Sequence, residues 1–238
     1  MLDSVLQEFL IRTAAAAGVE VLPDHADKFS KYGDLLLAWN NVMNLTAVTE
    51  KKEIVLKHYI DSITLLPRLD RTQCKTLVDI GTGAGFPGIP VKILRPELEV
   101  VLLDSLGKRV DFLNAVLSGL ELKGIRAVHL RAEDGGRMPE YREKFDCAVA
   151  RAVAPMNILL EYCMPFVKKG GYFLAMKGGS EEDPYENALQ ELCGSIETEE
   201  RFTLPESDFT RRILCVKKNN FLSTRYPRKA GIPRKNPL

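Results

Sequence analysis

Short apolar segments alternate with amphipathic helices along most of this chain, and this alternation limits the possible folds more than any other feature of the sequence. Apolar segments with little polar interruption are typical of parallel strands that helices cover on both faces. Only PESDFTR separates the last two segments, which is too short for a crossover helix, so these two are predicted to form an antiparallel hairpin. The expected strands cover 76–80, 99–104, 126–130, 145–150, 171–176, about 201–204 and 212–217.

The segments on either side of this pattern differ from it in composition. Phe29 and Tyr32 begin a series of apolar residues at three- and four-residue spacings, which predicts helices, and Trp39 is assigned to their core. Residues 217–238 contain seven Lys or Arg, no acidic residue and several prolines, so this tail is predicted to be extended rather than helical. We therefore expect a helical extension over 1–70, an α/β domain with a seven-stranded sheet over 71–218 and a basic, proline-containing tail over 219–238.

The charge, the cysteines and the lengths of the apolar runs exclude several classes of protein. A net charge of +1 does not by itself indicate a nucleic-acid partner, so the basic tail is the only sign of one. Five widely spaced cysteines are typical of a reducing compartment, and neither they nor the three histidines show metal-ligand spacing. The apolar runs are too short to cross a bilayer. We therefore expect a cytoplasmic protein without a metal and without a membrane contact. No dimerisation stripe is visible in the sequence, so a monomer is expected.

Glycines follow the first strand in the sequence GTGAGFPG, and they fit two different spacings. Gly83, Gly85 and Gly88 match the G-x-G-x-x-G of a dinucleotide loop, whereas Gly81, Gly83 and Gly85 match a tighter frame that begins directly at the end of the strand. Two prolines in FPGIP remove backbone N–H donors that a pyrophosphate would need at a helix start. The tighter frame and the terminal hairpin together favour S-adenosylmethionine over NAD.

Polar residues stand at the ends of the expected strands, where open α/β sheets bind their ligands. Asp79 directly precedes the glycines, and Asp104 ends the next strand, where a carboxylate can accept hydrogen bonds from the ribose hydroxyls of either cofactor. Glu133 follows the third strand at a position suited to an adenine. Arg151 follows the fourth strand, as a ligand contact or as a structural ion pair, and Lys177 the fifth, as a phosphate contact or as a solvated side chain.

Several stretches of the chain are similar to those of one family, the RsmG (GidB) bacterial methyltransferases. The combination of GTGAGFPGIP with DSLGKR is specific, whereas the glycines alone are not. The resemblance implies a Rossmann-like class I S-adenosylmethionine-dependent methyltransferase fold, methylation of N7 of a guanine in 16S ribosomal RNA, and this RNA or the small ribosomal subunit as partner. The matching stretches are WNNVMNLT (39–46), KHYIDSI (57–63), DIGTGAGFPGIPVKI (79–93), LLDSLGKRVDFL (102–113), ARAVAP (150–155), MKG (176–178) and YPRKAGIPRKNP (226–237).

The resemblance also implies which residues bind the cofactor. It assigns S-adenosylmethionine binding to Gly81, Phe86, the Ala132–Glu133 pair and Arg151, with Asp104 in the ribose position. The strand ends add the neighbouring residues Asp79, Gly83, Gly85 and Ser105 to this site. Arg151 is in addition the candidate catalytic residue, through a contact to the cofactor or to the O6 edge of the guanine.

Basic and polar residues outside the glycine loop are the candidates for contact with RNA, because basic side chains neutralise phosphates and a tyrosine can stack on a base. On charge alone the tail also fits a solvated, disordered segment, and the polar residues of the helical extension also fit helix caps and bridges. The resemblance favours RNA contact for the tail. The candidates are Asn44, His58, Lys177, Arg225, Arg228, Lys229, Arg234 and Lys235.

Methylation at N7 would place few chemical demands on the protein. This nitrogen is neutral and has an in-plane lone pair, so methyl transfer needs no general base, and catalysis is expected from positioning of the two reactants. The chain has no Pro-Cys nucleophile of the kind used for cytosine C5. Two other functions stay open at this point. One is an NAD(P)-dependent oxidoreductase with the wider glycine frame, and the other is a ribosome-associated binding protein with a vestigial cofactor pocket.

Overall fold

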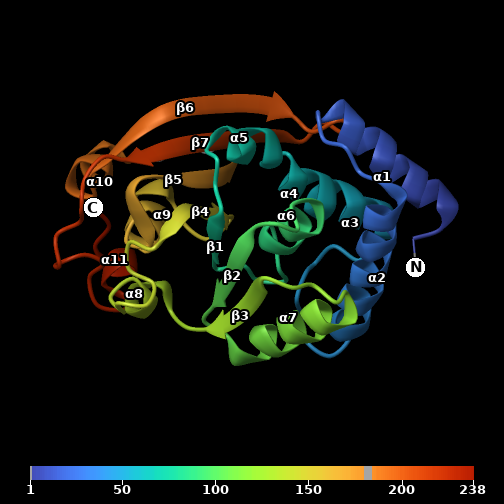
Figure 1. Cartoon of the computed structure of the whole chain (residues 1–238), viewed down its shortest axis with the longest axis horizontal. Coiled ribbons are helices and arrows are strands. Elements are labelled where there is room, and N and C mark those ends of the chain that lie inside the picture. Colours follow the sequence, from blue (N-terminus) through green and yellow to red (C-terminus); the bar gives the residue numbers. More distant parts are fainter. Residues whose placement is uncertain (1, 180–183) are drawn as a thin grey trace.

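The computed structural model describes residues 2–179 and 184–238, and within them seven strands form one sheet in the order β3-β2-β1-β4-β5-β7-β6 (Figure 1). Strands β1 to β5 are parallel, and β7 runs antiparallel to both β5 and β6. The predicted mostly parallel sheet with a C-terminal antiparallel hairpin is therefore confirmed. The strands are β1 (Thr76–Ile80), β2 (Glu99–Asp104), β3 (Ile125–His129), β4 (Phe145–Arg151), β5 (Val167–Gly178), β6 (Gly194–Thr203) and β7 (Thr210–Lys218).

Strand β6 is much longer than the segment expected at about 201–204. It forms the edge of the sheet beside β7, and most of its side chains are exposed, among them Glu197 and Glu199. A half-exposed edge strand does not need apolar residues on both faces, and charges on such an edge oppose pairing with other chains. The apolar pattern therefore predicted only one end of this strand.

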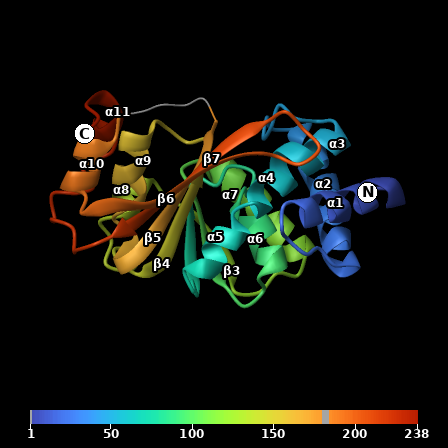
Figure 2. The same cartoon turned by 90° about the horizontal axis from the view of Figure 1, so that it is seen from above.

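Helices cover both faces of the sheet (Figure 2). Successive residues of a strand point to opposite faces, so Leu77 of β1 joins the core beneath one helical layer and Val78 the core beneath the other. On the Leu77 side lie α6 (Gly88–Leu94), α7 (Gly107–Gly119) and the helices that precede β1. On the Val78 side lie α8 (Ala132–Gly135), α9 (Met156–Cys163), α10 (Glu186–Glu191) and α11 (Ile232–Lys235).

The helices that precede β1 share a continuous apolar core with the sheet. Phe29 and Tyr32 of α2 are fully buried in it. Trp39, assigned to the core from the sequence, is partly buried and packs against this core, in a T-shaped contact with Phe112 of α7 at a centroid distance of 5.8 Å. The elements are α1 (Ser4–Ala16), α2 (Pro23–Asn40), α3 (Lys51–Ile54), a π-helix (Val55–Ile60), α4 (Asp61–Ile63) and α5 (Leu66–Arg71).

The tail differs from its predicted extended form. Gly231, at a φ of +83°, begins the short helix α11, and Pro233 stands in its first turn. Proline inside the first turn removes no intrahelical hydrogen bond, and its fixed φ is already helical, so the prolines did not exclude a helix here. No helix of the described ranges is long and apolar enough to span a membrane.

Candidate active site

The loop from β1 to α6 folds around the buried carboxylate of Asp79. Its Oδ2 accepts hydrogen bonds from the Thr82 hydroxyl at 2.7 Å and from the Gly88 N–H at 2.8 Å. Gly85 has a φ of +93°, and a Cβ there would lie 2.5 Å from Ile89 Cδ1, so glycine is required. Asp79 thus fixes the conformation of the loop through these hydrogen bonds. The sequence analysis, in contrast, placed Asp79 in the cofactor site.

Burial raises the pKa of the Asp79 carboxyl to about 6, and this makes the stability of the fold depend on pH. Between the unfolded and folded pKa values, only the folded chain holds the proton, so raising the pH favours unfolding. Relative to Asp79→Asn, the native chain is expected to lose about 2–3 kcal/mol of unfolding free energy between about pH 4 and about pH 7. Denaturant titrations across this pH range measure the loss of unfolding free energy. A difference in unfolding free energy between the two proteins that does not change with pH would contradict the prediction.

The carboxylate of Asp104 is also bound within the loop structure. Its Oδ2 accepts from the Gly83 N–H at 2.9 Å, and its Oδ1 accepts from the Leu106 N–H at 3.0 Å. The side chain of Arg109 approaches Oδ2 at 3.5 Å. Asp104 therefore connects the glycine loop to the end of β2, and the next residue, Ser105, is the one that lines a cavity.

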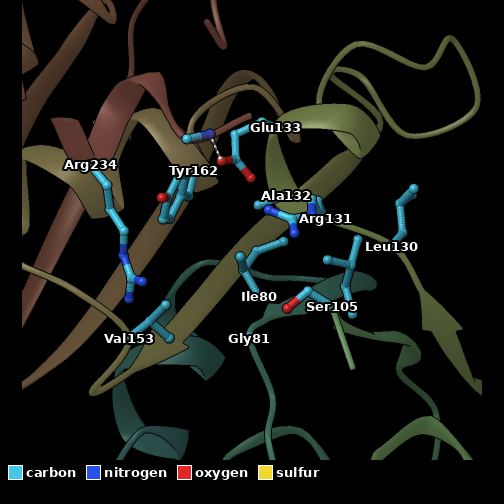
Figure 3. A pocket seen from close by; sticks show the side chains of 12 residues that line it. Ile80, Gly81, Ser105, Leu130, Arg131, Ala132, Glu133, Val153, Tyr162 and Arg234 are labelled. Atoms are coloured by element: carbon cyan, nitrogen blue, oxygen red, sulfur yellow. Dashed lines mark hydrogen bonds between the residues drawn. The ribbon is translucent and has the colours of Figure 1, made fainter. Parts of the chain in front are cut away.

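The first cavity lies beyond the carboxyl ends of β1, β2 and β3 and has a volume of about 200 Å³ (Figure 3). Its walls are apolar at Ile80, Leu103, Leu130 and Val153. Its polar groups come from the second and third strand ends, from α9 and from the tail, so it combines an apolar body with a few placed polar contacts, as ligand cavities do. The remaining lining residues are Gly81, Ser105, Arg131, Ala132, Glu133, Tyr162, Gly231 and Arg234.

Gly81 allows the segment after β4 to approach the glycine loop closely. A Cβ at Gly81 would lie 2.9 Å from Val153 Cγ2, and the φ of Gly81 is +68°. An L side chain at this position would therefore be strained and would push Val153 away. Because Gly81 has no side chain, this end of the cavity stays open and is bordered directly by the backbone.

A second cavity of about 330 Å³ lies at the ends of β4 and β5, and cationic side chains surround it. Asp61 is the carboxylate among them: its Oδ2 lies 3.1 Å from Arg151 and its Oδ1 2.8 Å from Arg211. Arg151 also donates to the Lys57 carbonyl at 3.1 Å. The lining residues are Lys57, His58, Asp61, Arg151, Ala152, Met176, Lys177, Gly178 and Arg211.

His58 projects into this second cavity from the π-helix. Its ring stacks on Phe86 at a centroid distance of 4.6 Å, and its Nε2 lies 2.8 Å from the Thr46 hydroxyl. Burial, together with the charge of Arg151, lowers the pKa of His58 to about 4. The Lys57 carbonyl can only accept, and at 3.1 Å it is closer to Nδ1 than the donating Arg151 guanidinium at 3.5 Å, so these contacts favour a proton on Nδ1, with Nε2 accepting from Thr46. The ring is therefore neutral at pH 7.

The structure divides the predicted cofactor residues into three groups. Gly81, Ser105, Ala132 and Glu133 line the first cavity. Asp79, Gly83, Gly85, Phe86 and Asp104 form or support the loop beneath it. Arg151 lies in the second cavity and makes the ion pair with Asp61 that was its structural alternative. Its role in binding the cofactor stays a prediction.

The predicted RNA residues are likewise distributed over several environments. His58 and Lys177 line the second cavity, and Lys177 is buried with its ammonium 3.1 Å from the Ala154 carbonyl, so it is not a solvated lysine. Asn44 is exposed and lines neither cavity.

The basic residues of the tail also differ from one another. Arg225 pairs with Glu191 and Arg228 with Glu161, whereas Lys229 and Lys235 are exposed. Arg234 is exposed as well, and it lines the first cavity. The tail is therefore not a solvated segment: two of its arginines hold it against the domain.

The sequence analysis missed several lining residues, among them Arg211 and Tyr162. Arg211 opposes Gly178 in the antiparallel pairing of β7 with β5, which brings the start of β7 to the carboxyl edge of the parallel strands. The predicted antiparallel hairpin could have indicated this, because the first residues of an antiparallel last strand lie at the carboxyl edge of the parallel strands. Tyr162 lies within α9, and no local pattern distinguishes it from a core aromatic residue.

Comparisons with known proteins agree with one another. The sequence model of the GidB family, described as rRNA small subunit methyltransferase G, matches residues 25–211. A protein of this name from Acetivibrio thermocellus is 53% identical over 98% of this chain and 97% of its own length. Its namesake from Desulfitobacterium hafniense is 50% identical over 98% of both chains.

A solved structure of a SAM dependent methyltransferase from Aquifex aeolicus covers 63% of this chain and 88% of its own, with a TM-score of 0.47 and 16% identity. The family match extends over most of the chain, and the two named relatives are similar over nearly their whole length. The chain therefore belongs to the GidB family, the family of rRNA small subunit methyltransferase G.

Proposed function

We propose that this protein transfers a methyl group from S-adenosylmethionine to N7 of a guanine in the 16S RNA of the bacterial small ribosomal subunit, in the cytoplasm and as a monomer. The family and the names of its relatives support the methylation of small-subunit RNA. The observation that carries the proposal is the adjacency of the two cavities: Val153 lines the first, and Arg151 and Ala152 line the second. Residues 151–153 thus border both the proposed site of the methyl donor and the proposed site of the guanine.

The first cavity has the features that S-adenosylmethionine requires. Glu133 and Ser105 offer acceptor oxygens for the hydroxyl and amine groups of an adenosine, and apolar residues such as Leu130 surround them. Gly81 leaves room beside the backbone, where a Cβ would meet Val153. When bound, the cofactor supplies a methyl group on a cationic sulfur.

The second cavity suits a guanine and the backbone that carries it. Guanine presents two acceptors, N7 and O6, on one edge, and arginine is the side chain that most often contacts this edge. Arg151 is held in place by Asp61 and by the Lys57 carbonyl, so a donor to O6 is already oriented. Lys57, Lys177 and Arg211 add positive charge, which attracts RNA phosphates.

The groups around the second cavity position the base and take no proton from it. N7 of guanine is neutral, so its lone pair is available without a base. His58 is neutral and engaged with Thr46, and its ring lies flat against Phe86. The structure therefore contributes mainly by holding N7 in line with the methyl group at close distance.

His58 is expected to contribute no pH dependence to the rate of methyl transfer between about pH 6 and about pH 8, because its pKa is lowered to about 4 and its ring stays neutral throughout. Single-turnover rates with saturating cofactor and RNA measure this. A rise in rate with a midpoint near the ordinary histidine pKa, absent in His58→Gln, would show instead that His58 acts as a general base.

Methyl transfer from labelled S-adenosylmethionine tests the function directly. Protein-free 16S RNA and small subunits from cells lacking the gene serve as alternative substrates, and mass spectrometry then maps the modified nucleotide. A 7-methylguanosine at one position supports the proposal. Label on another atom would overturn the N7 assignment. Binding of NADH without binding of S-adenosylhomocysteine in calorimetric titrations would favour the oxidoreductase alternative.

A further inference from the structure

The C-terminal strap, residues 226–235, forms one wall of the first cavity. Gly231 and Arg234 belong to its lining, opposite the ends of β1 and β2. In Figure 3 the side chain of Arg234 extends from the strap toward Val153, the residue that packs on Gly81. A segment that the basic composition assigned to RNA thus completes the cavity in which the methyl donor is proposed to bind.

Several contacts fix the strap in this place. The guanidinium of Arg228 binds both carboxylate oxygens of Glu161, at 2.6 and 2.9 Å, and Glu161 is completely buried. Arg142 donates to the carbonyl of Tyr226 at 2.7 Å. The Gly231 N–H donates to Glu133 Oε1 at 3.0 Å, which is the hydrogen bond drawn in Figure 3. The strap therefore orients the carboxylate of Glu133 as well as covering it.

Arg234 differs from the other arginines of the tail in its partners. Arg225 and Arg228 pair with Glu191 and Glu161, whereas no described carboxylate forms an ion pair with Arg234. Arg131, the other arginine of the lining, stands beside the Ala132–Glu133 pair. Arg234 instead extends toward the Gly81 end of the cavity, where the glycine loop and the segment after β4 meet.

We propose that Arg234 binds the carboxylate of the amino-acid portion of the cofactor, with the strap as a wall of the cofactor cavity. This inference rests on the proposed function. S-adenosylmethionine carries one carboxylate, and a planar guanidinium is the side chain whose donors best match a carboxylate. Glu133 is itself an anion and the Ser105 hydroxyl is an uncharged donor, so the cations of the lining, Arg131 and Arg234, are the groups best suited to a carboxylate. Of these two, Arg234 extends toward the Gly81 end of the cavity.

Two ligands that differ in the amino-acid portion test this assignment by calorimetry. S-adenosylhomocysteine has the carboxylate, and 5′-methylthioadenosine lacks it. Arg234→Ala is expected to weaken S-adenosylhomocysteine binding about tenfold, the scale of one charge-assisted hydrogen bond, and to leave 5′-methylthioadenosine within about twofold. Arg234→Lys is expected to restore part of the loss. Because the contact is at the cavity rim, the difference should shrink at high salt.

Lys235→Ala is the matched control, because this neighbouring lysine is exposed, as Arg234 is, but lies outside the lining. Thermal unfolding shows that each variant is folded. Equal losses for both ligands, no loss for either, or a selective loss in Arg131→Ala instead would each overturn the assignment. Failure of the unaltered protein to bind S-adenosylhomocysteine is a different result, since it would contradict the proposed function itself.

Discussion

Arg228→Ala is expected to lower the free energy of unfolding by about 3–5 kcal/mol, because it leaves a buried carboxylate without its cation. Glu161 is fully buried in α9, and Arg228 supplies it with two charged hydrogen bonds in addition to the one from its own backbone N–H at 2.7 Å. The backbone donor remains in the variant, but the charge is no longer compensated. Denaturant titration measures the change.

Arg225→Ala is the matched control for this experiment. Arg225 also pairs with a glutamate, but its side chain is 61% exposed, and an exposed ion pair contributes less than about 1 kcal/mol. Adding Glu161→Gln to Arg228→Ala removes the uncompensated charge and should recover part of the loss. A loss below about 1 kcal/mol in Arg228→Ala would show that water reaches Glu161 and that the strap is held by other contacts.

Arg151→Ala is expected to reduce the single-turnover rate of methyl transfer about 100-fold, the usual scale for losing one oriented donor in an active site. Asp61 and the Lys57 carbonyl hold the guanidinium in the second cavity. Its removal would leave O6 of the base without a partner. The affinity for S-adenosylhomocysteine, measured separately, should change less than about threefold, because Arg151 does not line the first cavity.

Two further variants and one spectroscopic measurement complete this experiment. Arg126→Ala removes an exposed arginine at the opposite end of the strands and should have no effect on the rate. Arg151→Lys should recover little, since lysine cannot reproduce the planar donors. The charge of Arg151 lowers the pKa of His58, so Arg151→Ala should raise it, as NMR titration can show. A parallel loss of S-adenosylhomocysteine affinity would instead place Arg151 on the cofactor.

The glycine loop and the strand ends were predictable because their signals are local. A buried parallel strand appears in the sequence as an apolar segment. The residues that directly follow such a segment must stand at the ligand-binding edge of the sheet. Gly81, Ser105 and Glu133 were identified in this way, and all three line the first cavity. The long edge strand β6 was underestimated because it is exposed on one side.

The contributions of distant segments were not predictable in the same way. Asp61 and Arg211 are far apart in the chain and meet only because β7 pairs antiparallel with β5 and the π-helix packs beside them. Glu161 offers no local sign that it will be buried against Arg228. Basic residues therefore looked alike in the sequence, although tertiary partners give Arg228 a structural role and bring Arg234 to a cavity.

The order in which the ribosome makes the chain gives the strap a further significance. Arg228 and Gly231 are synthesised after every strand of the sheet and after α9. Until Arg228 is present, Glu161 of α9 has no cation to pair with. A chain interrupted before residue 228 would carry an uncompensated buried carboxylate and a first cavity that lacks one wall, and it would favour partly folded states that cellular proteases recognise. Pairing of the buried carboxylate and completion of the first cavity therefore depend on the same late-synthesised segment.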